Sequence, residues 1–114
     1  MDIYCYDEID KPLARNVAEA LRASPHEAVT VHVNSYGGSV SEALAVYNAL
    51  QAHSGPVTVC AEGVVFSAAT MIACAGRCVA YKNALFGFHS PWSKTVGHAD
   101  DHRDVAVSLD KFTE

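Results

Sequence analysis

Hydrophobic and polar positions follow two different periods along the chain, and they do so in alternation. Five short apolar or β-branched runs are predicted strands: 3–6, 28–33, 57–61, 78–81 and 85–89. Between the first three runs, apolar residues recur every three or four positions, as on one face of a helix. The two stripes are Leu13, Val17 and Leu21, then Val40, Leu44 and Tyr47. Both segments are therefore predicted to be amphipathic helices.

Local signals bound the second of these helices. Ser39 precedes its first apolar residue, and Glu42 follows three positions later, which is the spacing of a capping box. Gly55-Pro56 closes the segment, as glycine and proline commonly do after a helix. The strand before it is expected to break at Asn34, ahead of the glycine pair Gly37-Gly38.

Two more helices are expected later in the chain. Residues 64–75 are apolar and small around one hydroxyl, which predicts a helix whose first turn holds Ser67 and which ends near Gly76. Residues 100–112 carry apolar residues at helical spacing and predict a final helix. This alternation of strand and helix predicts an α/β fold with a mainly parallel sheet and right-handed crossovers. The length predicts a single domain, residues 1–114.

Composition and charge exclude several classes of function. The formal net charge of −5 argues against nucleic acid as a partner. No apolar run is long enough to cross a membrane, and the acidic start of the chain is unlike a signal peptide, so a cytoplasmic protein is expected. Half the residues are hydrophobic and only 18% are charged, which suggests that another subunit covers part of the surface.

Cysteine and histidine give no metal site by their spacing. The four cysteines stand in apolar contexts and are expected to be cytosolic thiols that pack like small hydrophobic residues: Cys5, Cys60, Cys74 and Cys78. Cys74 and Cys78 lack a second pair of ligands for zinc. His98 and His102 lie one helical turn apart, but a solvated helix face explains them better. No metal and no cofactor are expected.

Three features together could carry acyl-transfer chemistry. Ser67 is a candidate nucleophile, His89 at the end of a predicted strand is a candidate base, and Gly37-Gly38 offers backbone N–H groups to a ligand. Each also has a plainer interpretation: a helix N-cap for the serine, a structural histidine, and a simple turn for the glycines. The functional interpretation requires that the three segments converge at one edge of the sheet.

Three motifs resemble the Clp-type serine peptidases, especially the phage and prophage branch that acts in head maturation. They stand in order as HVNSYGGSVSEALAVYNAL (32–50), GVVFSAA (63–69) and FGFHSPW (86–92), within a similarity that covers 3–109. Each motif alone is weak, whereas the ordered set is specific. Tyr36 departs from the pattern, because the family usually has proline before the glycine pair.

The resemblance implies a role for each motif residue. Ser67 would be the nucleophile that forms an acyl-enzyme, and His89 its general base. The backbone N–H groups of Gly38 and Ala68 would form the oxyanion hole. Gly37 and Gly38 would also begin the edge along which an extended substrate peptide pairs.

The resemblance further implies a fold, an assembly and partners. The fold would be ClpP/crotonase-like, with a C-terminal handle helix starting near His98. The subunits would form a homo-oligomeric ring, commonly heptameric and stacked in pairs, in a bacterial cell or encoded by a phage. The substrate would be a polypeptide, and the partner an AAA+ unfolding ATPase or a capsid protein.

The third catalytic residue of the family, normally an aspartate, would lie beyond Glu114, so the C-terminal part of the family domain is expected to be missing. The nearest acids, Asp100, Asp101 and Asp104, fit the first turn of the final helix better. Two alternatives to a peptidase therefore stay open. One is a weak or inactive relative that acts in assembly. The other is a crotonase-like enzyme acting on acyl-CoA.

Overall fold

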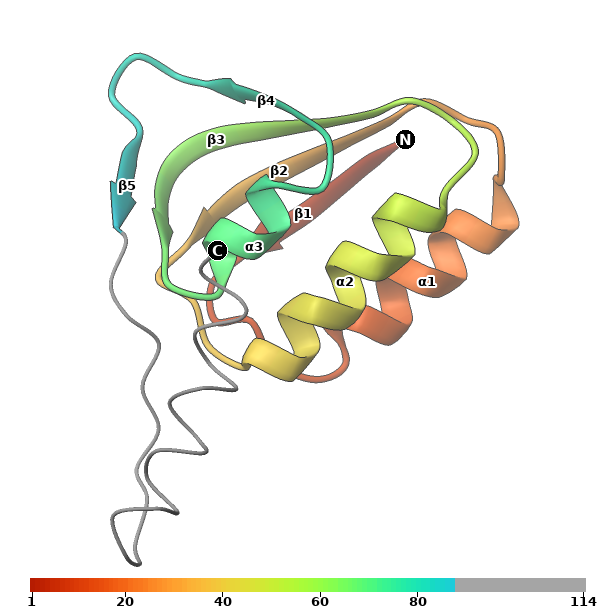
Figure 1. The fold of residues 1–114 in the computed structure, drawn as a ribbon, viewed down its shortest axis with the longest axis horizontal. Helices are drawn as coiled ribbons and strands as arrows, with labels where there is room; N and C mark the ends of the chain where they lie inside the picture. Colours follow the sequence, from red (N-terminus) through yellow and green to blue (C-terminus); the bar gives the residue numbers. More distant parts are fainter. Residues whose placement is uncertain (88–114) are drawn as a thin grey trace, which may run out of the picture.

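The computed structural model of the chain describes residues 1–87, which form an α/β unit with helices on one side of a parallel sheet (Figure 1). The elements, in chain order, are β1 (Asp2–Tyr6), α1 (Leu13–Ala23), β2 (Val29–Ser35), α2 (Val40–Ala52), β3 (Val57–Phe66), α3 (Ala69–Ala73), β4 (Arg77–Ala80) and β5 (Leu85–Gly87). The predicted α/β class with a mainly parallel sheet is confirmed. The predicted helix 100–112 and the handle lie outside the described residues.

The sheet is organised around β3, the longest strand. Its strand order is β1-β2-β3-β4, and β5 pairs with β3 further along, all in parallel. The first half of β3 pairs with β4, whereas its last residues, Val64–Phe66, pair with Leu85–Gly87. Consecutive parallel strands need crossover connections, and α1 and α2 provide the first two. This arrangement brings β5 to the same end of β3 from which the chain continues to Ser67.

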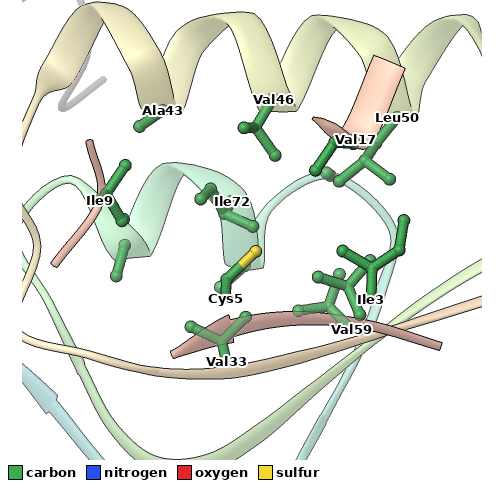
Figure 2. Packing of buried hydrophobic residues seen from close by; sticks show 14 of the residues in the cluster. Ile3, Cys5, Ile9, Val17, Val33, Ala43, Val46, Leu50, Val59 and Ile72 are labelled. Carbon is green, nitrogen blue, oxygen red and sulfur yellow. The ribbon is translucent and has the colours of Figure 1, made fainter. Parts of the chain in front are cut away.

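The hydrophobic core lies between the sheet and the three helices, as Figure 2 shows. Alternate residues of β2 are buried against the helices, which is the period that a strand with one covered face requires. Ile72 of α3 lies between α2 and the strands. The largest fully buried side chains of the core are Ile9, Val29, Val31, Val33, Val46, Leu50, Val59, Val65 and Ile72. Each contributes about 1.5–3 kcal/mol relative to an exposed position.

The buried face of α2 differs from the predicted one. The core contains Ala43, Val46 and Leu50, whereas Leu44 and Tyr47 of the predicted stripe are only half-buried. Alanine at the contact lets α2 lie close to its neighbours, because it adds little bulk there. In α1, two residues of the predicted stripe, Val17 and Leu21, are confirmed to be buried.

The capping box at the start of α2 forms only in half. Ser39 Oγ accepts a hydrogen bond from the Glu42 N–H at 3.2 Å, as predicted. The Glu42 carboxylate does not return to Ser39, because it accepts from the Ala14 N–H at 2.8 Å in the first turn of α1. The Ser39 N–H donates to the Ile9 carbonyl instead. Glu42 therefore joins two helices rather than closing one.

Two strands run further than predicted. The strand β2 continues through Asn34 to Ser35, and β3 continues through 62–66 up to the residue before Ser67. By contrast, α3 ends at Ala73 and does not reach Gly76. The extra strand residues pair with neighbours distant in sequence, so the local turn signals did not mark the true ends.

The cysteines divide into two kinds. Cys5 is buried, and burial raises the pKa of its thiol to about 11. Cys60 is half-buried, but Cys74 and Cys78 are exposed, so the prediction that all four pack like core residues is wrong for these two. Across residues 1–87, no helix has both the length and the hydropathy of a membrane-spanning segment.

Candidate functional site

Ser67 occupies the turn between β3 and α3 with a backbone φ of 56°. Residues other than glycine rarely adopt this left-handed region, and such strain concentrates at functional sites. The helix begins at Ala69, and its N-cap position is Ala68, without a side-chain cap. Ser67 Oγ makes no hydrogen bond within residues 1–87. The interpretation of Ser67 as a helix N-cap is therefore wrong, and its hydroxyl has no structural partner in the part of the chain described.

A bulge in β3 directs the strand toward this turn. Val33 pairs with Ala61 but Ser35 pairs with Val65. An advance of two residues along β2 therefore corresponds to four residues along β3. The Asn34 side chain fills the bulge, where its Oδ1 accepts a hydrogen bond from the Val64 N–H at 3.0 Å. Bulges bend a strand and re-aim the residues after it. Sequence reasoning missed this role of Asn34, because it depends on pairing between distant segments.

Gly37 lies directly against Ser67. A Cβ at Gly37 would stand 2.8 Å from Ser67 Cβ and 2.9 Å from the Phe66 carbonyl oxygen. The backbone φ of Gly37 is 108°. No other residue fits here without a clash and a strained backbone. The structure therefore brings together two of the three predicted features, the serine and the glycine pair.

The residues that follow Ser67 and Gly37 each have a backbone N–H without a partner within the described residues. They are Ala68 and Gly38. Ala68 N lies 3.1 Å from the place of a Gly37 Cβ, so it lies against Gly37. The Gly37 N–H donates to Ser35 Oγ at 3.0 Å. Its carbonyl accepts from the Ile9 N–H at 2.9 Å. Gly37 is thus occupied by its own chain, and pairing with an external peptide would start at Gly38.

The end of β5 lies beside Ser67. The Ser67 N–H donates to the Gly87 carbonyl at 3.2 Å, and Phe66 is paired with Gly87 in the sheet. His89, the predicted base, follows two residues later in the sequence and lies outside the described residues. So do the candidate acids and the histidine pair, which are Asp100, Asp101, Asp104, His98 and His102.

A pocket of about 520 Å³ opens beside the glycine pair. Its walls come from the end of β2, the glycine loop, the turn after β1 and Val64 of β3. Tyr36, at the position where the family usually has proline, is 71% exposed at its rim and packs edge-to-face on Phe66. The pocket is therefore continuous with the backbone of Gly38, whose N–H has no partner in residues 1–87.

Figure 1 shows the helices within residues 1–87 on one side of the sheet. A second polar group lies on the other face, at strand positions that alternate with the buried ones. We call it the open-face cluster, and it consists of Asp2, Tyr6, His32 and Glu62. His32 contacts Asp2 at 2.8 Å through Nε2 and Glu62 through Nδ1. Tyr6 donates to Glu62 at 2.6 Å. Tyr4 stacks on the His32 ring at 4.5 Å.

Hydrogen bonds within the open-face cluster shift the pKa of each member. The contacts with Asp2 and then Glu62 raise the pKa of His32 above its ordinary 6.5. His32 in turn lowers the pKa of both carboxyl groups. The hydrogen bond to Glu62 raises the pKa of Tyr6 to about 12. Within the described residues, no group of three or more His, Cys, Asp or Glu side chains could hold a metal ion.

The chain matches the Clp protease family over residues 1–114. The ATP-dependent Clp protease proteolytic subunit of Dehalococcoides mccartyi is 31% identical over 83 residues, covering 70% of this chain and 42% of that protein. Subunit 2 of the same protease from Thermobifida fusca is 29% identical, covering 94% and 56%. The chain thus spans about half the length of the curated relatives that it matches.

A solved structure supports the fold independently. ClpP1 from Listeria monocytogenes, in a single-substitution mutant form, superposes with a TM-score of 0.79 over 95% of this chain and 64% of that chain. Its sequence is 22% identical, so the likeness is one of fold. The parallel sheet, the serine turn packed on a glycine loop, and the match over residues 1–114 agree with one another, and they place this chain in the Clp protease family.

Proposed function

We propose that this chain acts as a Clp-like serine endopeptidase, which cleaves polypeptides through an acyl-enzyme. The observation that carries the proposal is the Ser67 turn. Ser67 has a φ of 56° and no hydrogen bond to its hydroxyl in residues 1–87, and it lies against Gly37. The N–H groups of the next residues, Ala68 and Gly38, have no partner within the same residues. A nucleophile and an oxyanion hole need this combination.

This placement supports one role for each group. Ser67 Oγ attacks the scissile carbonyl, and the N–H groups of Gly38 and Ala68 stabilise the negative oxygen that forms. Free donors held in a fixed position are worth more than water there, because they need no reorganisation during the reaction. The substrate chain extends from Gly38 along the pocket as an added strand.

His89 is the proposed general base. The support is the place where β5 ends: Gly87 is hydrogen-bonded to the Ser67 N–H, and His89 is two residues further on. The proposal requires the imidazole to reach Ser67 from a position two residues beyond Gly87, and two residues of extended chain would span about 7 Å. The proposal assigns only nucleophile, base and oxyanion hole, since the chain spans about half of its relatives.

The finer biological setting is also part of the proposal. The resemblance of the three motifs to the phage and prophage branch supports a role in capsid maturation, in the cytoplasm of a bacterial cell. Assembly into a homo-oligomeric ring is supported by large apolar side chains exposed in the single chain. These are Tyr4, Tyr6, Tyr36, Val79, Tyr81, Leu85 and Phe86, with exposed fractions of 39–71%.

A fluorophosphonate probe tests the serine mechanism. We expect the wild-type protein to be labelled on Ser67, and the Ser67→Ala variant to show no labelling above background. Ser41→Ala removes an exposed hydroxyl at the start of α2 and serves as the matched control, which should label like the wild type. Equal labelling of wild type and Ser67→Ala would remove Ser67 from the mechanism.

The same exposed apolar side chains favour the second candidate, a subunit that acts only in assembly. The two candidates differ in turnover, so a fluorogenic peptide assay separates them. Hydrolysis that disappears in Ser67→Ala supports the peptidase. An oligomer that is labelled on Ser67 but turns over no peptide supports the assembly function.

A further inference from the structure

Thr70 makes two hydrogen bonds to one atom of the Ser67 turn. Its N–H donates to the Ser67 carbonyl oxygen at 3.0 Å, and its hydroxyl Oγ1 donates to the same oxygen at 2.6 Å. The backbone bond is an ordinary bond of a helix start. The hydroxyl bond depends on the side chain, so it can be removed without changing the backbone.

The Ser67 carbonyl and the Ala68 N–H belong to one peptide unit. A peptide bond is planar, and in its trans form the C=O and the N–H point in opposite directions. A contact that fixes the direction of the Ser67 carbonyl therefore fixes the direction of the Ala68 N–H. That N–H lies beside Gly37 and has no partner within the described residues.

The position of Thr70 is itself fixed by the core. It lies on α3 between Ala69 and Ile72, which are both fully buried. As a β-branched residue it has few side-chain rotamers in a helix, and one of them directs Oγ1 to the carbonyl one turn earlier. The turn it holds is strained, because Ser67 has a φ of 56°. A second bond to the carbonyl opposes rotation of the peptide out of that strained conformation.

We propose that Thr70 is a positioning residue, whose hydroxyl holds the Ser67–Ala68 peptide so that the Ala68 N–H stays directed at the oxyanion. Thr70 does not contact the substrate. The catalytic consequence rests on the proposed function, whereas the position of the peptide does not.

Two variants separate the hydroxyl from the shape of the side chain. Thr70→Val keeps the branched shape and the backbone N–H but has no hydroxyl donor, and Thr70→Ser keeps the hydroxyl donor and loses a methyl group. In crystal structures, the Ser67–Ala68 peptide should rotate in Thr70→Val and keep the wild-type orientation in Thr70→Ser. An unchanged peptide in Thr70→Val overturns the proposal, whatever the labelling shows.

Fluorophosphonate kinetics measure the consequence. The rate of the covalent step should fall about two- to tenfold in Thr70→Val, the range of one neutral hydrogen bond. Thr70→Ser should recover the wild-type rate, and the initial binding constant of the probe should be the same in all three proteins. A Thr70→Ser protein as slow as Thr70→Val counts against the hydroxyl. A wild type that does not label overturns the peptidase, while the crystal structures still decide the position of the peptide.

Discussion

Two polar regions of this molecule treat their hydrogen-bonding groups in opposite ways. In the open-face cluster, each side chain is paired with another: His32 with Asp2 and Glu62, and Tyr6 with Glu62. Around Ser67, the hydroxyl and two nearby backbone donors have no partner within residues 1–87, and the backbone is strained. The groups with shifted pKa values are in the open-face cluster, whereas the groups without a partner in residues 1–87 are at the Ser67 turn.

The difference shows what a shifted pKa indicates in this protein. Perturbed titratable residues are used as markers of active sites, but structural ion-pair networks perturb pKa values as well. The open-face cluster satisfies its own charges, so it behaves as a link between β1, β2 and β3. Free donors next to a strained serine are the better marker of chemistry here, because they have capacity left for a substrate.

Gly37→Ala should give the largest effect, because it directly disturbs the strained backbone at the Ser67 turn. The added Cβ would stand 2.8 Å from Ser67 Cβ at a φ of 108°, which should lower the free energy of unfolding by about 2–4 kcal/mol. Displacing the turn should slow fluorophosphonate labelling at least about 100-fold, as loss of an oxyanion donor does. Chemical denaturation and labelling rates measure the two effects.

Gly76→Ala is the matched control for that variant. Its Cβ would stand 2.4 Å from the Val57 carbonyl oxygen, a comparable clash away from Ser67. This variant should lose about 1–3 kcal/mol of stability. At a temperature where both variants remain folded, Gly76→Ala should still label at a near wild-type rate. If the two variants label alike, the contact between Gly37 and Ser67 has no special role.

The sequence predicted that the serine and the glycine pair meet, but it did not predict the left-handed backbone of Ser67, which was expected inside the helix. Ser67 and Gly37 belong to local motifs. Such motifs can be recognised in the sequence without knowing how distant segments pair. The bulge filled by Asn34 depends on how β2 and β3 align, which no local pattern records. The roles of His89 as base and of Gly38 and Ala68 as oxyanion donors stay predictions.

Errors in the predicted helices have the same cause. The contact of Glu42 with Ala14 spans 28 positions, and it replaces the local capping bond that the spacing indicated. The buried face of α2 includes Ala43 rather than Leu44, because the space between α2 and the sheet decides which side chain fits. The hydrophobic period thus predicted where α2 lies in the sequence, whereas tertiary packing determines which of its faces is buried.

His32→Asn should remove the pH dependence that the open-face cluster gives to stability. Because the folded-state pKa of His32 is raised above 6.5, its contribution is complete below pH 6.5 and is lost as the pH rises through the folded value. The lowered pKa values of Asp2 and Glu62 give a contribution that is lost as the pH falls below their ordinary 3.8 and 4.5. The cluster should therefore stabilise most between about pH 4.5 and 6.5.

Urea denaturation at several pH values from 5.5 to 8.5 measures this effect, with about half-unit spacing around the imidazole range. The wild-type free energy of unfolding should decline with rising pH more steeply than that of His32→Asn. His26→Asn, which removes an exposed imidazole, should follow the wild-type curve. Parallel curves for wild type and His32→Asn would show that the cluster does not link protonation to folding. Labelling of Ser67 at a fixed pH should stay the same in all three proteins.

Tyr6→Phe should give the smallest effect, and it tests whether the two regions are independent. The chain has five tyrosines, and the hydrogen bond to Glu62 raises the pKa of Tyr6 to about 12. Titration of tyrosinate absorbance should therefore lose its step near pH 12 in Tyr6→Phe and keep it in Tyr36→Phe. The rate of Ser67 labelling should not change in Tyr6→Phe, because the cluster shares no hydrogen bond with the Ser67 turn within residues 1–87. A slower rate would show that the open face and the Ser67 turn act as one site, and that the contrast between them does not hold.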